Sequence, residues 1–326
     1  MDDKKLPKDP MRPSVVIVSV ICGCIMFLGF WYMLFSQLFG NLFGIIGTNS
    51  STESYVVGDT IDVIRVEGGI YSGSSTYNHY WTLSRIESLM ADDQNKAIFL
   101  YIDSPGGGIY ESDELYLKLK EYKEVTGRPI YAYMGSTAAS GGVYVSMAAD
   151  KIFANRMTMT GSIGVIMSLT DTTGLQDLIG IKQDNITSGK NKAMGNPLTD
   201  EQRAILQSLI DESYDIFVEI IAENRNLDKN KVYELADGRL YSPKQAEELG
   251  LIDGIMTYDE AMEALVEEYN LQDCFINEQS PPVSLIQELL YGVSSGLDRS
   301  KVLSHFSEIR SYIEDNRGPK LMYMMN

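Results

Sequence analysis

The chain has 326 residues, of which 44% are hydrophobic, and this is enough for one large domain or two modest ones. Its formal net charge is −18, and a protein this acidic is not expected to bind nucleic acid, whose partners carry basic surfaces. Three cysteines and two histidines, without a C-x-x-C pair, predict neither a metal site nor a bound cofactor.

The first feature in chain order is an uncharged apolar segment over residues 14–46. It exceeds the roughly 20 residues that span a bilayer, so we expect a transmembrane anchor with a short juxtamembrane stretch. Lysine and arginine within residues 1–13 predict a cytoplasmic tail there, with the catalytic part of this single-pass cell-membrane protein outside the cytoplasm. A cleaved signal peptide is the main rival, but no A-x-A-like site closes the segment. Because Cys22 and Cys24 lie in the anchor, Cys274 has no partner for an internal disulfide.

Residues 55–270 alternate strand and helix patterns, which predicts an α/β domain. The expected strands are 61–66, 97–102, 129–134, 151–154 and 163–167. The expected helices are 80–89, 110–125, one that begins near Ser140, 199–223, 229–236 and 242–250. Thr199 with Gln202 fits a capping box at the start of the helix over 199–223. Residues 271–326 are expected to form a C-terminal helical tail.

A run of small residues, Gly-Ser-Thr-Ala-Ala-Ser-Gly-Gly, occupies positions 135–142, where a strand is expected to meet a helix. Its Ser140 is a candidate nucleophile, because the small neighbours let a peptide approach and a helix N-terminus favours negative charge. The competing interpretation is that small residues only let a buried helix pack closely against a sheet. The residues alone leave both interpretations open.

A second glycine-rich turn, Asp-Ser-Pro-Gly-Gly-Gly at 103–108, follows a buried strand. Backbone N–H groups in such a turn can point at a ligand, which makes it a candidate for stabilising the oxyanion of acyl transfer. It fits a plain turn between strand and helix as well. Neither the P-loop pattern nor G-x-G-x-x-G is present, so the turn is not predicted to bind a nucleotide.

A serine nucleophile needs a base, and both histidines, His79 and His305, lie far from Ser140 in the sequence. The polar stretch before the helix over 199–223 offers three lysines instead, which are Lys182, Lys190 and Lys192. We take Lys192 as the best candidate, against the alternative that all three belong to a solvated basic loop. A lysine is protonated at neutral pH unless it is shielded from water, so a lysine base must be sheltered.

Five motifs occur in a fixed order along the chain: DSPGGG at 103–108, AASGG at 138–142, TGSIGV at 160–165, SGKNK at 188–192 and AEELGLID at 246–253. In these motifs the chain resembles the bacterial signal peptide peptidase A family, and the resemblance runs from about residue 61 to about residue 268. It implies an α/β fold like that of Clp proteases and crotonases, a superhelix of βαβ units behind a single transmembrane helix. It also implies a membrane-anchored serine protease.

The resemblance implies a role for each of five residues. Ser140 would be the nucleophile, Lys192 the general base 52 positions later, and Ser162 the hydroxyl that orients the lysine amine. Gly107 and Gly141 would donate backbone N–H groups to the oxyanion hole. These roles together describe peptide hydrolysis by a Ser/Lys dyad without a cofactor.

Members of this family form rings in which the base comes from a neighbouring subunit, so the resemblance implies a ring-shaped homo-oligomer that shelters Lys192. Remnant signal peptides and similarly extended apolar segments would be the substrates. Val143-Tyr144 departs from the paired aromatic residues of many members, which bears on the shape of the pocket. Three alternatives stay open: a quality-control protease for membrane proteins, a crotonase-like enzyme for coenzyme A thioesters, and a non-catalytic ring-forming scaffold.

Overall fold

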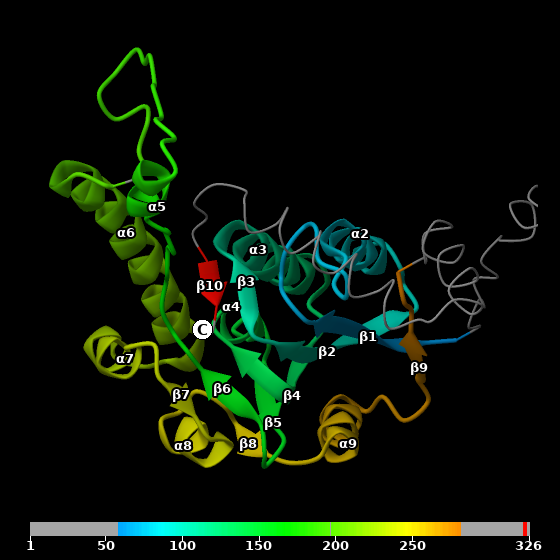
Figure 1. Ribbon diagram of the computed structural model, residues 1–326. Helices are drawn as coiled ribbons and strands as arrows, with labels where there is room; N and C mark the ends of the chain where they lie inside the picture. The colour runs from blue at the N-terminus through cyan, green and yellow to red at the C-terminus, as the bar shows by residue number, and fades with distance from the viewer. Residues whose placement is uncertain (1–57, 196, 282–321, 325–326) are drawn as a thin grey trace, which may run out of the picture. The chain divides into compact units, whose positions relative to one another are not determined.

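The computed structural model describes residues 58–195, 197–281 and 322–324 (Figure 1). All described residues belong to one compact unit, which begins at Val56. None of the described helices is both long and apolar enough to cross a bilayer. The anchor predicted for residues 14–46 lies outside the described residues.

A mostly parallel sheet forms the centre of the domain, in the order β7-β6-β4-β2-β1-β9. Its long strands are β1 (Thr60–Glu67), β2 (Asn95–Ser104) and β4 (Ile130–Ala139), which pair in parallel. The start of β4 also pairs with β5 (Lys151–Ala154) and its end with β6 (Met159–Gly161). The short strand β7 (Leu240–Tyr241) pairs with β6, and the short strand β8 (Gly254–Ile255) pairs with β5. This mixed α/β architecture agrees with the predicted fold class.

Both faces of the sheet are covered, because its strands are apolar on both sides. Ile64 and Val66 of β1 join the larger core with α2 (His79–Met90), α3 (Ile109–Thr126) and α6 (Asp200–Arg225). Their neighbours Ile61 and Val63 point to the opposite face, where α9 (Tyr258–Tyr269) covers a smaller aromatic-rich core. Figure 1 shows α2 and α3 on one side of the sheet and α9 on the other. The alternation of side-chain direction along β1 thus explains why helices pack against both faces of the sheet.

The helices begin and end near the positions that the sequence predicts. The Thr199–Gln202 capping box is present at the start of α6. A second capping box, between Ser242 and Gln245, starts α8 (Pro243–Glu248). The connecting helix α7 spans Lys229–Leu235, and α4, directly after Ser140, spans Gly141–Ser146. Helix α5 (Thr173–Leu178) and helix α9 were not expected from the sequence.

Two expectations need correction. The strand predicted over 163–167 is wrong, because the strand in this region is β6, which ends at Gly161, and the backbone turns there. Gly161, the last residue of β6, has φ 90° and Ser162 has φ 51°, so the backbone leaves the extended conformation at these two residues. The helical tail predicted for 271–326 does not match its described part: β9 (Phe275–Glu278) adds a parallel strand to β1, and β10 (Met322–Met324) pairs with β3 (Gly106–Gly108). The domain's sheet therefore extends past residue 270.

Candidate active site

Three strands of the sheet end close together, and each leads into a motif that the sequence analysis singled out. Strand β2 ends at Ser104 before the glycine strand β3, β4 ends at Ala139 before Ser140, and β6 ends at Gly161 before Ser162. In α/β sheets, ligand sites form at the carboxyl ends of the strands. We therefore locate the candidate active site at this edge.

Ser140 is the residue that joins β4 to α4, and its backbone has φ 53° and ψ −112°. A positive φ is uncommon for a residue with a side chain and costs on the order of 1–3 kcal/mol. Such a sharp strand-to-helix turn is how α/β hydrolases present a nucleophilic serine. The strain at Ser140 therefore favours the catalytic interpretation of the small-residue run over plain close packing.

The hydroxyl of Ser140 is buried, and within the described part of the chain its Oγ has no hydrogen-bond partner. A buried polar atom without a partner is rare, because desolvating it costs free energy that no contact returns. The hydroxyl does not cap α4 either. An unpaired hydroxyl is expected of a nucleophile whose base and substrate are not bound.

The two glycines expected to form the oxyanion hole lie against each other. A Cβ built on Gly141 would sit 3.2 Å from the backbone nitrogen of Gly107. The N–H of Gly141 lies in the first turn of α4, where N–H groups have no partner inside the helix. Two donors from two different strand ends thus lie beside Ser140, an arrangement that can hold a negative oxygen.

The strand β3, which carries Gly107, is fixed by contacts that the sequence did not reveal. Ile70 pairs with Gly107 in parallel, and a Cβ on Gly107 would lie 2.2 Å from the carbonyl oxygen of Ile70. Ser104 turns the chain into β3, because its Oγ donates to Gly68 O over 2.6 Å and accepts from Gly106 N over 3.1 Å. Any side chain at position 107 would clash with the Ile70 backbone, so only glycine fits there. The pairing with Ile70 fixes the direction of the Gly107 N–H.

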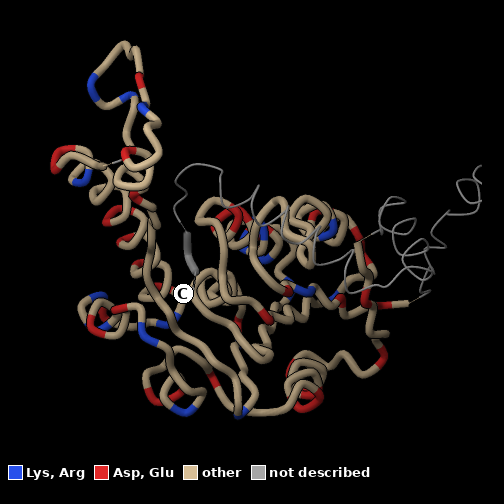
Figure 2. Tube along the Cα trace, viewed as in Figure 1, with Lys and Arg blue, Asp and Glu red and all other residues tan. Residues whose placement is uncertain are grey.

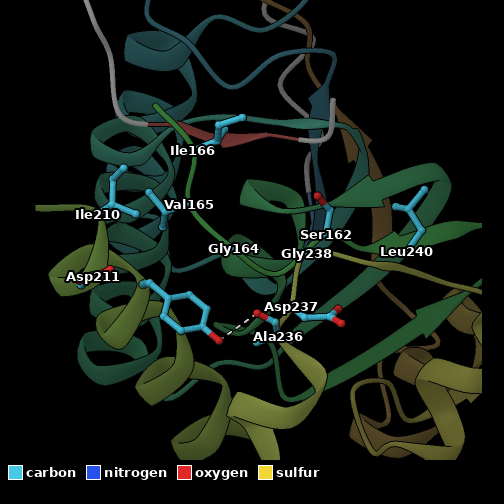
Figure 3. A pocket seen from close by; sticks show the side chains of 11 residues that line it. Ser162, Gly164, Val165, Ile166, Ile210, Asp211, Ala236, Asp237, Gly238 and Leu240 are labelled. Carbon is cyan, nitrogen blue, oxygen red and sulfur yellow. Dashed lines mark hydrogen bonds between the residues drawn. The ribbon is translucent and has the colours of Figure 1, made fainter. Parts of the chain in front are cut away.

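Ser162 stands next to Ser140 across the β4–β6 pairing, in which Ala139 is opposite Gly161. Its backbone φ is also positive, at 51°, and its N–H donates to Arg239 O over 2.7 Å. Ser162 lines a pocket of about 460 Å³ together with residues of α6 and of the turn before β7 (Figure 3). Apolar side chains such as Val165 and Ile210 share this lining with the carboxylates of Asp211 and Asp237.

Lys192 is not brought to Ser140 within the chain. It is exposed in the segment between α5 and α6, which projects away from the sheet (Figure 1) and carries several basic residues (Figure 2). Of the two other candidates, Lys182 is exposed as well, and Lys190 forms an exposed ion pair with Glu201 at 2.7 Å. The structure thus brings Ser140, Ser162, Gly107 and Gly141 together and leaves Lys192 outside this group.

The residues after the glycines belong to the core. Val143 and Tyr144 are both buried, and Tyr144 packs against Tyr116 and Phe217 while its hydroxyl donates to Asp113 over 2.6 Å. Neither residue lines the pocket beside Ser162. Their departure from the family pattern therefore concerns how α4 is anchored.

One polar residue near the site escaped the sequence analysis. Ser112 of α3 is buried, its Oγ has no partner among the described residues, and a Cβ on Gly141 would lie 2.6 Å from it. A serine within a helix gives no sequence signal for such a position. In the described ranges, no group of three His, Cys, Asp or Glu side chains is arranged to hold a metal ion.

Residues 123–272 match the family described as peptidase family S49. A protein of Enterococcus faecium named signal peptide peptidase SppA is 40% identical over 205 residues, which are 62% of this chain and 59% of that protein. A protease of Synechocystis sp. is 39% identical over 203 residues, 61% of this chain and 70% of its own length. The chloroplast serine protease SPPA of Arabidopsis thaliana is 30% identical over 248 residues, 73% of this chain and 36% of its own length. The chain thus matches less than two thirds of the first and third of these relatives.

Proposed function

We propose, because this chain belongs to peptidase family S49, that it is a membrane-anchored serine endopeptidase that degrades remnant signal peptides. The family assignment carries the reaction class, which is peptide hydrolysis by a serine nucleophile. The name of the Enterococcus faecium relative supports signal peptides, or similarly extended apolar segments, as substrates. The fold of Clp proteases and crotonases is part of the same proposal.

The observation that carries the proposal is the strained turn at Ser140 beside the backbone of Gly107 and Gly141. In the first step the Ser140 Oγ attacks the scissile carbonyl carbon while a lysine amine accepts the hydroxyl proton. The carbonyl oxygen becomes an oxyanion, which the N–H groups of the two glycines stabilise. The intermediate then releases the amine product, which takes the proton from the lysine, and leaves an acyl-enzyme.

Water completes the cycle in the second step. It attacks the ester carbonyl carbon of the acyl-enzyme while the same lysine amine takes one of its protons. The second tetrahedral intermediate collapses, the Ser140 Oγ recovers its proton from the lysine, and the carboxylic product leaves. Each step therefore needs one neutral amine within hydrogen-bond reach of the reacting oxygen.

We assign the base to Lys192 of a neighbouring copy in a ring-shaped homo-oligomer. Two observations support this assignment: Lys192 is exposed in the single chain, and Ser162 opens into a pocket beside the nucleophile. An amine that entered this pocket would leave bulk water and meet the Ser162 hydroxyl, which would orient it. The negative charge of Asp211 favours the approach of a basic segment.

The membrane location is the remaining part of the proposal. The apolar segment over 14–46, with its preceding basic residues, supports a single-pass anchor with the N-terminus in the cytoplasm and the catalytic domain outside. Substrates left in the membrane after secretion would then lie close to the enzyme.

A cleavage assay with the full chain in detergent tests this function. The substrate is an extended apolar peptide with a fluorophore and a quencher at its ends. Ser140→Ala and Lys192→Ala are each expected to lower kcat by more than about 10³-fold, because the nucleophile and the base act as one unit. Lys190→Ala is the matched control, since Lys190 is exposed in the same segment, and it should keep wild-type activity. Full activity of either Ser140→Ala or Lys192→Ala would refute the dyad.

A further inference from the structure

Helix α3 carries a serine whose hydroxyl does not make the hydrogen bond that is usual in a helix. Ser146 and Thr126 make it, because their hydroxyls donate to a backbone carbonyl three or four residues earlier, over 2.7 and 2.6 Å. Ser112, the fourth residue of α3, is fully buried, yet its Oγ has no partner among the described residues. The Ser112 hydroxyl therefore does not serve the backbone of its own helix.

Close packing of α3 against α4 does not account for this hydroxyl. The position needs a small side chain, because a Cβ on Gly141 of α4 would lie 2.6 Å from the Ser112 Oγ. Alanine would meet this need better, since a buried hydroxyl without a partner destabilises the fold. In the described ranges, three buried side-chain atoms have no partner, and two of them are the Oγ atoms of Ser112 and Ser140. Two unpaired hydroxyls beside one turn indicate a site for a polar group.

The Ser112 hydroxyl lies close to both glycines of the proposed oxyanion hole. Side chains in a helix lean towards its N-terminus, which for α3 is the glycine strand β3. The Cβ position of Gly141 is 2.6 Å from Ser112 Oγ and 3.2 Å from Gly107 N, so these two atoms are less than about 6 Å apart. The nitrogen of Gly141 itself lies about 2.5 Å from the same point.

These separations fit a shared acceptor. Two donors that bind one oxygen are at most about 6 Å apart, because each donates over about 2.9 Å. The distances therefore allow one oxygen to accept from the Ser112 hydroxyl and from the N–H groups of Gly107 and Gly141.

We propose that Ser112 is a third oxyanion donor, whose hydroxyl donates to the carbonyl oxygen of the substrate as negative charge develops there. This inference rests on the proposed function, since the charge forms only when Ser140 attacks a carbonyl. No bond is made or broken at Ser112, and its proton stays on Oγ throughout. A buried donor that is already in place stabilises such a charge strongly, because it needs no reorganisation and no water competes for it. The hydroxyl has no partner within the chain because its partner is the substrate oxygen.

Steady-state cleavage by full-chain variants in detergent tests this role. Ser112→Ala is expected to lower kcat about 10²-fold and to keep KM within about twofold of wild type, because an oxyanion donor acts only in the transition state. Ser112→Cys should lose as much, although it fills the space, since a thiol is a weak donor. Ser146→Ala, which changes a buried helical serine with a backbone partner, is the matched control and should keep wild-type kcat. Wild-type kcat in either Ser112 variant would overturn the proposal.

Inhibitor binding separates a donor from a residue that only shapes the site. When a peptide aldehyde binds, the Ser140 Oγ forms a bond to the aldehyde carbon, the carbonyl π bond breaks and leaves its charge on oxygen, and the hydroxyl proton passes to the lysine amine. The peptide alcohol of the same sequence binds without forming an oxyanion. Ser112→Ala is expected to raise the Ki of the aldehyde about 10²-fold and to leave the Ki of the alcohol unchanged. Equal effects on the two inhibitors would overturn the proposal.

A double variant provides a test that does not depend on one substitution. Gly141→Ala is expected to lower the melting temperature, because its Cβ would collide with the Ser112 Oγ. Adding Ser112→Ala removes this collision, so the double variant should regain the lost melting temperature. Its kcat should stay as low as that of Ser112→Ala, since the donor is still absent. Recovery of kcat together with the melting temperature would assign Ser112 a packing role only.

The outcomes also separate this inference from the proposed function. A wild-type protein that neither cleaves the peptide nor binds the aldehyde would refute the proposed function, and this inference with it. Cleavage by the wild type that Ser112→Ala leaves unchanged would refute the inference alone.

Discussion

The backbone N–H of Ser140 donates to the carbonyl oxygen of Gly161 over 2.8 Å, and this bond sets Ser140 beside Ser162. Both serines have a positive φ, and they come from the ends of two strands that pair with each other. The sheet therefore fixes the position of the proposed nucleophile, Ser140, relative to the Ser162 hydroxyl that is proposed to orient its base. Four predictions follow from this arrangement and its surroundings.

Gly107→Ala is expected to lower kcat by about 10²- to 10³-fold, the usual effect of losing one oxyanion donor. The physical reason is steric, because a Cβ at this position would lie 2.2 Å from the carbonyl oxygen of Ile70 and would move the strand. Steady-state cleavage of a quenched peptide measures the effect. Gly174→Ala, where the added Cβ meets no atom within 4 Å, is the control and should leave kcat unchanged. Wild-type kcat in Gly107→Ala would exclude Gly107 from the oxyanion hole.

Ser140→Ala is expected to raise the melting temperature by about 2 °C while it abolishes activity, because it removes a buried hydroxyl that has no partner among the described residues. Differential scanning calorimetry measures the shift. Ser146→Ala is the matched control: Ser146 is also buried, but its Oγ donates to Val143 O over 2.7 Å, so its loss should lower the melting temperature. A lower melting temperature for Ser140→Ala would show that the hydroxyl has a stabilising contact.

A mixture of Ser140→Ala and Lys192→Ala chains tests whether the base acts between subunits. If Lys192 serves a neighbour, co-expressed chains should recover about one quarter of the wild-type activity, because each site needs one intact serine and one intact neighbouring lysine. Each variant alone should stay inactive. The cleavage rate of the purified mixture, relative to wild type at equal protein, gives the answer. Absence of any recovery in mixed oligomers would assign the base to the same chain.

Asp237 is expected to stay ionised through the whole range in which the enzyme works. The side-chain hydrogen bond from Arg239, with Nε 2.7 Å from Oδ1, lowers the pKa of Asp237 from 3.8 to about 2. Because the pKa is lowered on folding, this contact stabilises the fold above about pH 4 and loses its effect as the pH falls towards 2. The carboxyl resonance in an NMR titration measures this pKa, and Arg239→Ala should return it towards 3.8. A pKa near 4 in the wild type would contradict the contact.

The sequence predicts well those parts of the fold that local patterns determine. The apolar runs at 97–102 and 129–134 lie within β2 and β4, and the Thr199 cap starts α6 where expected. The small-residue run, between an apolar strand pattern and a helix pattern, predicts a strand-to-helix turn at Ser140. These features depend on neighbours a few residues away, so one sequence reveals them.

Features that depend on distant partners were missed. The segment 163–167 is apolar enough for a strand, but the positive φ at Gly161 and Ser162 turns the chain first, and φ is not visible in a sequence. The sequence of β9 has no strong strand pattern of its own, and it forms a strand by pairing with β1. Strand β10 pairs with the glycines of β3, which lie more than 200 residues earlier in the chain. The position of Lys192 relative to Ser140 also depends on distant parts of the chain, and no local pattern specifies it.

The role of Ser140 as the nucleophile is tested by identifying the residue that reacts with a fluorophosphonate. The full chain in detergent is labelled, digested and analysed by mass spectrometry. We expect one phosphonylated residue, Ser140, and loss of the label in Ser140→Ala and in Lys192→Ala. A label on another serine, or undiminished labelling of the chain that lacks Ser140, would contradict it.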